Sequence, residues 1–324
     1  MIIGLPKALL YYQYGTLLET FLTELGCEVL ISDDTNKFIF EQGMQDAVSE
    51  CCIPAKAYLG HVRSLKGRCD YLLVPYATRK TGGDAICLRF WGISDVIRHT
   101  YPDMRLLEYD MCKDSSDFHG LKPLAKQLGK NTRRIRFAYE AAADAQKRYE
   151  SKLKEAQKSL LQTSLIIDNK LKILVAGHPY IIHDPAIGGP VVRILSELGA
   201  TPIFSDRFDR KESQGLYRDV SPRLFWAANQ EVMGAIATHK KEVDGILLLT
   251  VFPCAPDALA CEMIIRTIKD IPIIPILLDG LHGEAGLVTR LECFLDIINE
   301  RKCHSETGTT CNFIPTHGQL SHTY

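Results

Sequence analysis

Residues 245–269 read GILLLTVFPCAPDALACEMIIRTIK and combine an apolar run, a proline-flanked cysteine and a stretch with helical spacing. The run at 245–251 is short and strongly apolar, which predicts a strand buried in a parallel sheet. The spacing at 258–269 predicts that a helix follows. Functional groups of parallel α/β sheets collect on loops at the carboxyl ends of strands. Cys254 stands at such a position, shortly after the predicted strand.

Both halves of the chain alternate predicted strands and helices in this way. Such alternation indicates βαβ units and parallel sheets. We therefore expect an α/β fold of two Rossmann- or flavodoxin-like lobes, two copies of one architecture without a visible sequence repeat. The predicted strands are 1–5, 27–31, 70–75, 105–109, 173–176, 201–204, 245–251 and 273–278. The predicted helices are 8–25, 35–48, 53–65, 93–99, 188–198, 224–239, 258–269 and 286–300.

A helical segment joins the predicted lobes. Residues 121–163 contain little Gly or Pro and are rich in Ala, Lys, Glu, Gln and Arg, so we expect one or two long helices there. A length of 324 residues also suggests two domains. The predicted organisation is an N-terminal lobe at 1–117, a helical connector at 118–170, a C-terminal lobe at 171–303 and a loose tail at 304–324.

The composition argues against nucleic-acid and nucleotide binding. The net charge is −1, whereas a nucleic-acid-binding protein usually carries a basic face. Arg133, Arg134 and Arg136 form the densest basic group, and we interpret them as a solvated helix face because the surrounding charges are mixed. Neither the glycine motif of dinucleotide-binding sites nor that of P-loops occurs, so the sequence does not support binding of ATP or NAD.

The cysteines carry more information than the overall charge. The first residues lack the basic and apolar regions of a signal peptide, and no run approaches the ~18 apolar residues of a membrane span. We therefore expect a cytoplasmic protein with no membrane partner, in which the 11 cysteines are buried, catalytic or metal-bound. Five of them fit structural roles: Cys27 and Cys69 in the core, Cys293 on or beside the apolar face of a helix, and Cys303 and Cys311 in the tail.

Three other cysteines stand at predicted sheet edges. Cys52 lies in ECCIPAK, Cys87 in the glycine-rich KTGGDAICLRFWG and Cys254 in VFPCAPD. Two of them share the pattern C-x-P at a helix entry, where proline suits the first turn. A helix N-terminus favours negative charge, which predicts a lowered pKa for the thiol and suits an anionic iron–sulfur cluster. An inert buried thiol explains each cysteine equally well when it is taken alone.

The type of donor narrows the choice of metal. Three thiolates suit zinc or an iron–sulfur cluster. Structural zinc normally has four ligands, often from close C-x₂-C pairs, and no such pair occurs here. Widely spaced cysteines from two lobes fit a cluster in the cleft between the lobes better. Three thiolates on four irons would leave one iron open to substrate, water or another ligand.

Stretches along most of the chain resemble the 2-hydroxyacyl-CoA dehydratase and benzoyl-CoA reductase superfamily. Within it, the sequence is most similar to the activase-associated branch, whose members are often described as CoA-dehydratase-activase-related. The stretches are IGLPKALLYY at 3–12, LGCEVLISDDTNK at 25–37, ECCIPAK at 50–56, GHV at 60–62, IC at 86–87, GHPY at 177–180 with DP at 184–185, VFPCAPDAL at 251–259 and GEAGLVTRLE at 283–292.

The resemblance implies a function as well as a fold. Family members hold a [4Fe–4S] cluster on three cysteines, which correspond to Cys52, Cys87 and Cys254, and some relatives hold a double-cubane [8Fe–9S] cluster. A separate ATP-hydrolysing activase with its own iron–sulfur cluster supplies low-potential electrons, under anaerobic conditions. Homodimers and heterodimers of related subunits both occur. The implied activity is that of a dehydratase or reductase component acting on an acyl-CoA or another small molecule.

The sequence departs from the family pattern at two of these cysteines. Cys87 is followed by Leu where relatives commonly have Pro, and the motif of Cys254 is C-A-P where C-G-P is usual. Cys51 directly precedes Cys52 and is a candidate to replace it as a ligand. Cys261 lies seven residues beyond Cys254, and we expect it in the core.

Other polar residues are weaker candidates for the site. They are His178, His183, Asp184, His282 and Glu284 near strand ends, and Lys56 in the first turn after Cys52. Helix capping or surface exposure explains each of them as well as a role in proton transfer. Two further functions stay open: a non-catalytic iron–sulfur carrier or scaffold, and a binding protein for small molecules with metal-free cysteines.

Overall fold

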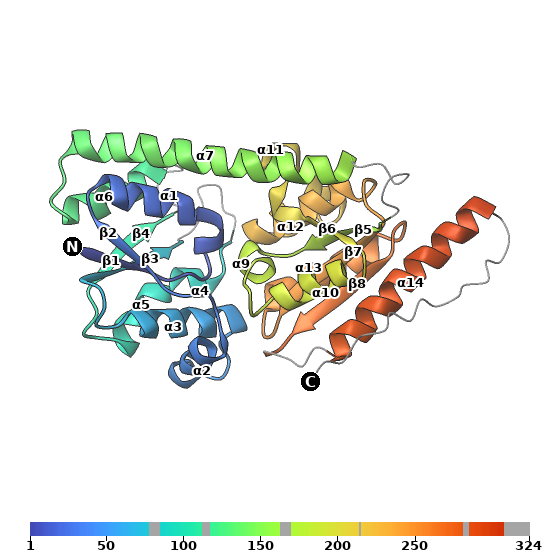
Figure 1. Cartoon of the computed structure of the whole chain (residues 1–324), viewed down its shortest axis with the longest axis horizontal. Helices are drawn as coiled ribbons and strands as arrows, with labels where there is room; N and C mark the ends of the chain where they lie inside the picture. The colour runs from blue at the N-terminus through green and yellow to red at the C-terminus, as the bar shows by residue number, and fades with distance from the viewer. Residues whose placement is uncertain (78–84, 112–116, 163–169, 214, 281–284, 308–324) are drawn as a thin grey trace.

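The computed structural model describes residues 1–77, 85–111, 117–162, 170–213, 215–280 and 285–307, which form two α/β lobes (Figure 1). Each lobe contains a four-stranded parallel sheet, in the orders β2-β1-β3-β4 and β6-β5-β7-β8. The two orders are equivalent, so the predicted fold class and its duplication are confirmed. The strands are β1 Ile2–Leu5, β2 Glu28–Ile31, β3 Tyr71–Tyr76, β4 Leu106–Asp110, β5 Lys172–Ala176, β6 Thr201–Phe204, β7 Gly245–Val251 and β8 Ile273–Leu278.

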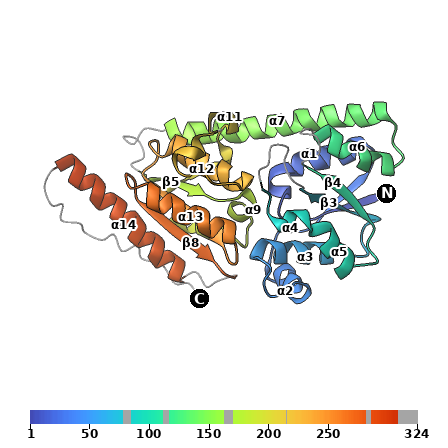
Figure 2. The same cartoon turned by 180° about the vertical axis from the view of Figure 1, so that it is seen from behind.

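Helices cover both faces of each sheet (Figures 1 and 2). In the first lobe and connector they are α1 Tyr11–Glu24, α2 Lys37–Asp46, α3 Ile53–Leu65, α4 Leu88–Trp91, α5 Ile93–Thr100, α6 Asp117–Gln127 and α7 Thr132–Gln162. In the second lobe they are α9 Pro179–Ile182, α10 Gly189–Glu197, α11 Arg210–Ser213, α12 Ala227–His239, α13 Ala255–Thr267 and α14 Ala285–Thr307. Two short 3₁₀ helices, η2 Ser205–Arg207 and η3 Leu216–Asp219, complete it. No helix in these described ranges is long and apolar enough to cross a membrane.

The strand order creates a crevice in each lobe. β1 lies between β2 and β3, with Ile3 aligned to Val29 on one side and to Tyr71 on the other. Helix α1 connects β1 to β2 on one side of it, and α3 connects β2 back across β1 to β3. Because these two connections run in opposite directions along the sheet, α1 and α3 cover opposite faces of it. Ligands of open α/β sheets bind at such a switch point, beyond the carboxyl ends of the strands. β5 holds the equivalent place in the second lobe.

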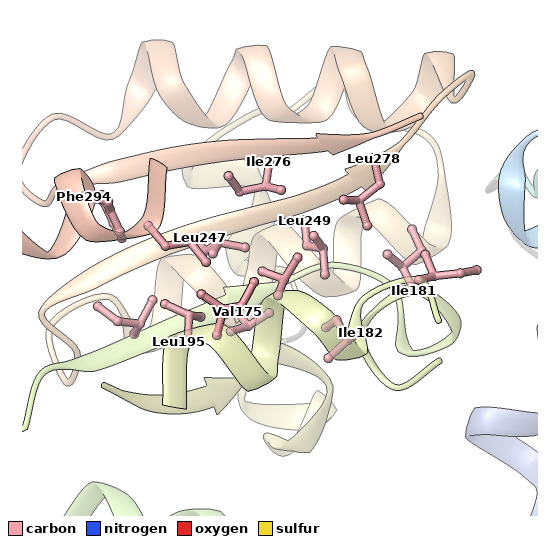
Figure 3. Packing of buried hydrophobic residues seen from close by; sticks show 14 of the residues in the cluster. Val175, Ile181, Ile182, Leu195, Leu247, Leu249, Ile276, Leu278 and Phe294 are labelled. Carbon is pink, nitrogen blue, oxygen red and sulfur yellow. The ribbon is translucent and has the colours of Figure 1, made fainter. Parts of the chain in front are cut away.

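Apolar side chains fill both faces of each sheet. In the first lobe, α1, α6 and α7 pack on one face and α3 and α5 on the other. In the second lobe, α12 and α13 cover one face. The opposite face packs against α9, α10 and α14, and Figure 3 shows Val175, Leu247, Leu249 and Ile276 of the sheet among Ile181, Leu195 and Phe294 of those helices. These apolar runs on both faces are what the sequence predicted for buried parallel strands.

The long helix α7 fastens the connector to both lobes (Figures 1 and 2). Near its middle, the buried Gln146 Oε1 accepts a hydrogen bond from the Leu17 N–H of α1 at 3.1 Å. Farther along, Gln157 pairs with the backbone of Phe204 in β6, donating at 3.0 Å and accepting at 2.8 Å. A helix otherwise rich in charge therefore has two buried amides, one for each lobe.

Apolar contacts also join the lobes directly. Phe40 of α2 and Ile53 of α3 belong to the same buried cluster as Ile181 and Ile182 of the second lobe. On the neighbouring helices, the ring of Phe90 meets the ring of Tyr180 at 5.6 Å between centroids. The helix that begins at Cys52 is therefore packed against both lobes.

Some predicted helix limits differ from the structure. The first helix starts at Tyr11 rather than residue 8, because Leu9 adopts a left-handed backbone with φ 51°. That conformation costs a non-glycine residue about 1–2 kcal/mol. α13 starts at Ala255, three residues earlier than predicted, and α14 continues to Thr307. The rest of the predicted tail lies outside the described residues.

Two glycines set the distance between α2 and α3. A Cβ at Gly43 would overlap the carbonyl oxygen of Lys56, and a Cβ at Gly60 would overlap that of Ile39. The backbones of the two helices therefore touch. This close approach fixes the helix whose first turn follows Cys52.

We expect Gly60→Ala to destabilise the protein by at least about 1–3 kcal/mol, because the new methyl group meets backbone rather than a flexible side chain. Gly286→Ala is the matched control, since a Cβ there meets no neighbouring atom, and it should stabilise helix α14 by up to about 1 kcal/mol. Urea denaturation of both variants measures these changes. Equal stabilities for the two variants would contradict the close contact.

His61 fixes α3 from its other side. Its ring is fully buried, with Nδ1 2.8 Å from the Ser32 hydroxyl and Nε2 2.9 Å from the Thr35 hydroxyl. Burial lowers the pKa of His61 to about 4; Asp34 raises this pKa and Lys7 lowers it further, both by smaller amounts. The imidazole is therefore neutral in the folded chain at neutral pH.

Acidification should weaken the fold through His61. An unfolded histidine binds a proton below a pH of about 6.5, whereas folded His61 does so only below about 4. The free energy of unfolding should therefore fall as the pH drops between these values, by up to about 3 kcal/mol in total. Urea denaturation of the wild type and His61→Gln across this window measures the slope. A slope that stays unchanged in the variant would contradict the assignment.

Candidate functional site

Cys52 caps the N-terminus of α3. It stands immediately before Ile53, has an extended backbone (φ −67°, ψ 155°), and is followed by a proline in the first helical turn. The backbone N–H of Ala55 lowers the pKa of its thiol, although the sulfur makes no capping hydrogen bond. The helix entry predicted from C-x-P is therefore present.

Cys254 caps α13 in the same manner. Its backbone is extended (φ −128°, ψ 97°), and Pro256 lies in the first turn. The Asp257 backbone N–H lowers the pKa of the Cys254 thiol and the Asp257 carboxylate raises it, while the sulfur makes no capping hydrogen bond. Both C-x-P cysteines thus occupy an N-cap position, and the backbone N–H three residues later lowers the pKa of each thiol.

Cys87 stands before α4, a helix of four residues. Its loop is joined to the second lobe by two backbone hydrogen bonds of Ala85, to Phe225 O at 2.7 Å and from Ala227 N–H at 3.1 Å. Cys87 therefore comes from the first lobe but is held close to the start of α12.

Electrostatic interactions connect the three cysteines with Tyr180. Burial raises the pKa of Tyr180 well above its ordinary value, and charges nearby raise it further, in the order Asp257, Cys254, Cys87 and Cys52. The Tyr180 ring stacks on His178 at 5.2 Å between centroids. Cys87 and Cys254 line one cavity with Tyr180, and the helices that follow these two cysteines, α4 and α13, belong to different lobes (Figure 2).

The expected lowering of the thiol pKa is wrong for two of these cysteines. Burial raises the pKa of Cys52 to about 11, more than the Ala55 N–H lowers it. Burial also raises the pKa of Cys254, and the adjacent Asp257 carboxylate raises it further. Removal from water therefore outweighs the helix N-terminus, and a metal would have to displace protons in order to bind.

A buried polar group supports Cys254 from the second lobe. Asp257 Oδ1 is 2.8 Å from His178 Nε2 and accepts from Asn229 Nδ2 at 2.7 Å. Burial raises the pKa of Asp257 and is the largest single effect, but His178 and these hydrogen bonds together outweigh it and hold the pKa at about 2. For His178, burial lowers the pKa, and the Asp257 carboxylate outweighs this effect, so the net shift is upward. The pair is an ion pair fixed beside the cysteine.

A cavity of about 150 Å³ opens between Cys87 and Cys254, with Phe90, Trp226 and Tyr180 in its wall. A larger cavity of about 350 Å³ shares Leu10, Tyr180 and His178 with it and extends toward Arg210. The space beside the cysteines is therefore lined mostly by apolar and aromatic groups and has room for a small molecule.

Single-metal sites are absent from the part of the chain that the structure describes, where no group of three His, Cys, Asp or Glu side chains is close enough to hold one ion. Cys51 is buried beside Cys52, and Cys261 packs half-buried against a core cluster, as expected. Cys27 and Cys69 also pack in cores. Cys293 is exposed and lies beside the apolar face of α14, which Leu291 and Phe294 form.

The remaining polar candidates have partners of their own. His183 Nε2 lies 2.8 Å from Asp206 Oδ2. Lys56 Nζ donates to the Ser49 carbonyl at 3.1 Å, at the surface. Asp184 is buried between the lobes. His282 and Glu284 lie outside the described residues.

Comparison with known families decides where the chain belongs. Residues 2–208 match the sequence model of the CoA enzyme activase uncharacterised domain. The chain belongs to this family. The match confirms the predicted resemblance to the activase-associated branch of the CoA dehydratases. It covers the first lobe, the connector and the start of the second lobe, and so contains Cys52 and Cys87 but not Cys254.

Other comparisons add little. No curated protein matches the chain. Among solved structures, a protein from Salmonella typhimurium LT2 that is named as sugar binding has 11% identity and a TM-score of 0.26, over 92% of this chain and 88% of its own. The C-terminal domain of glucosamine-fructose-6-phosphate aminotransferase from Francisella tularensis has 13% identity and a TM-score of 0.23, over 92% and 84%. Such scores carry no argument about fold or function.

Sequence reasoning missed two residues of the site. Asp257 is the fourth residue of C-A-P-D, and Tyr180 is the last of G-H-P-Y. Both stood in quoted motifs. An acid three residues after a helix-capping cysteine was the available signal for Asp257, whereas Tyr180 meets the cysteines only through long-range packing.

We expect Asp257→Asn to lower the pKa of Cys254, because the carboxylate raises it by charge and by hydrogen bonding. Alkylation of Cys254 by iodoacetamide should then quicken, roughly tenfold for each unit of pKa. Site-resolved mass spectrometry measures the rate, and Cys52, whose pKa does not depend on this carboxylate, is the internal control. Unchanged Cys254 alkylation would contradict the assigned role of the carboxylate.

Proposed function

We propose that the chain is an iron–sulfur protein that holds one [4Fe–4S]-type cluster on Cys52, Cys87 and Cys254. It receives low-potential electrons from an ATP-hydrolysing activase and works as a reductase or dehydratase component. The observation that carries the proposal is that Cys87 of one lobe and Cys254 of the other line one cavity. Cys52 is near enough for its charge to raise the pKa of Cys254 and for the charge of Cys87 to raise the pKa of Cys52. Membership of a family named for CoA enzyme activase supports the activase as partner.

The donor set fits a cluster better than a single ion. Cluster ligands bind different irons, so their sulfurs surround the group instead of meeting at one point, in keeping with the lack of a compact three-ligand group in the described ranges. Cys52 and Cys254 stand at helix N-termini, where the backbone N–H groups of Ala55 and Asp257 lower the thiol pKa. Hydrogen bonds to the sulfurs help to set the reduction potential of a cluster.

The protein's own part in the chemistry is position, dryness and charge. The cluster would supply the low-potential electron when bound. Phe90 and Trp226 line the adjoining cavity and limit water there. Tyr180 lines that cavity together with Cys87 and Cys254, so its hydroxyl is a candidate donor of a hydrogen bond to a molecule bound there.

The space beside Cys87 and Cys254 favours an enzyme component over a carrier. A carrier needs an exposed or fully ligated cluster, whereas here a cavity of about 150 Å³ adjoins two of the thiols and continues into one of about 350 Å³. A cluster held by the three thiolates would lie beside this space and would supply a low-potential electron to a molecule bound there. The substrate would then be a small molecule, or the reactive part of an acyl-CoA.

Anaerobic purification followed by iron and sulfide analysis tests the proposal. We expect about four irons and four sulfides per chain in the wild type and strong loss in Cys52→Ser, Cys87→Ser and Cys254→Ser. Cys69→Ser and Cys261→Ser are matched controls at half-buried thiols outside the site, and they should keep the iron.

Each alternative has its own outcome in this experiment. About eight irons per chain would point to a double-cubane cluster. A cluster that ignores added small molecules after reduction by an activase would favour a non-catalytic carrier. A wild type that stays free of iron after anaerobic reconstitution would contradict the proposal and favour a metal-free binding protein.

A further inference from the structure

A chain of buried hydrogen bonds crosses from one lobe to the other. It runs from Ser32 through His61 and Thr35 to Asp184, and each of these side chains is less than 5% exposed. Thr35 Oγ1 donates to Asp184 Oδ2 at 2.5 Å, and the Tyr12 hydroxyl donates to the same oxygen at 3.2 Å. These residues lie in stretches that resemble the CoA dehydratase superfamily, at 25–37, 60–62 and 184–185, and the resemblance implies no role for them.

The direction of these bonds is determined by the number of available protons. The one Thr35 hydroxyl proton goes to Asp184, so Thr35 Oγ1 must accept from His61 Nε2–H at 2.9 Å. His61 is neutral because burial lowers its pKa to about 4, so its Nδ1 accepts from the Ser32 hydroxyl at 2.8 Å. Ser32 Oγ in turn accepts from the Lys7 backbone N–H at 2.8 Å. One series of donors runs from the Lys7 N–H through Ser32 to His61 Nδ1, and the other runs from His61 Nε2–H through Thr35 to Asp184.

Asp184 is equally well anchored in its own lobe. Its other oxygen, Oδ1, accepts from the backbone N–H groups of Ala186 at 2.9 Å and Ile187 at 3.1 Å. The residue lies shortly after α9, the helix that carries Tyr180. One carboxylate therefore accepts two bonds from each lobe.

We propose that Asp184 is a positioning residue that locks the second lobe onto the first and so sets where Cys254 stands relative to Cys52 and Cys87. Its consequence for a cluster rests on the proposed function; its effect on the lobes does not. Apolar contacts between the lobes, such as those of Phe40 and Ile53, are non-directional. Hydrogen bonds fix distance and angle, and buried polar groups can specify one arrangement among several compact ones.

The substitution Asp184→Asn interrupts this series of hydrogen bonds while it keeps the shape of the side chain. The amide has one acceptor oxygen, so its NH₂ group must face either the two backbone N–H groups or the hydroxyls of Thr35 and Tyr12. In the second case Thr35 Oγ1 accepts from the amide as well as from His61 Nε2–H, and the Thr35 proton loses its acceptor. Thr35→Val removes the bridging hydroxyl by itself, and Thr35→Ser keeps it.

A matched control exists within the second lobe. Asp206 Oδ2 lies 2.8 Å from Nε2 of His183, and that pair stays within one lobe. Asp206→Asn therefore makes the same chemical change without touching the bridge. It separates the loss of a buried carboxylate from the loss of the connection between lobes.

Two measurements on the full chain test the proposal. Small-angle X-ray scattering of the metal-free protein should show a larger radius of gyration for Asp184→Asn and Thr35→Val, and wild-type values for Thr35→Ser and Asp206→Asn. The reduction potential of the reconstituted protein should shift in the first two variants and stay in place in the other two.

Wild-type scattering and potential in both Asp184→Asn and Thr35→Val would overturn the proposal, and Thr35→Val decides alone where Asp184→Asn does not fold. If the wild type binds no iron, the proposed function fails, and the scattering comparison by itself still judges the role of Asp184.

Discussion

The parallel direction of the strands is the constraint on which the site depends. Parallel strands place all their carboxyl ends at one edge of a sheet. Here residues that follow β1, β3, β5 and β7 line a single cavity, because the two lobes turn these edges toward each other. Cys87 and Cys254 follow equivalent strands of the duplicated fold. Cys52 and Cys87 come from the first lobe and Cys254 from the second, so the arrangement of the lobes is itself part of the candidate site.

Burial and helix ends act on the thiols in opposite directions. A capping position offers free N–H groups and a favourable dipole, and Cys52 and Cys254 both stand at one, where the N–H groups of Ala55 and Asp257 lower the thiol pKa. Removal from water nevertheless raises the pKa of both thiols. The same burial that keeps the free thiols protonated would strengthen the hydrogen bonds to an anionic group once it is bound, because charges interact more strongly in a less polar medium. The N–H groups are then arranged for a bound anion rather than for a free thiolate.

The sequence allowed the fold to be predicted well because its signals are local. Short apolar runs such as 245–251 identified all eight strands within a residue or two, and Gly or Pro marked several helix ends. The start of α1 was missed because Leu9, and not a glycine, takes the left-handed conformation. The contacts of the site were harder to predict. The bond from Thr35 to Asp184 joins residues 149 positions apart, and no periodicity reports such a pairing. The exposure of Cys293 followed from which face of α14 the sheet covers.

The duplication also shows where the two lobes differ at the site. Helix α3 in the first lobe corresponds to α12 in the second, since each joins the second strand of its lobe to the third. The residues directly before α3, α4 and α13 are Cys52, Cys87 and Cys254, whereas Trp226 stands directly before α12. The loop of Cys87 bonds to the backbone on either side of Trp226, and this indole lines the cavity that Cys87 and Cys254 share. The helix entry equivalent to that of Cys52 thus carries an aromatic ring instead of a thiol, so the two lobes contribute different chemistry to one cavity.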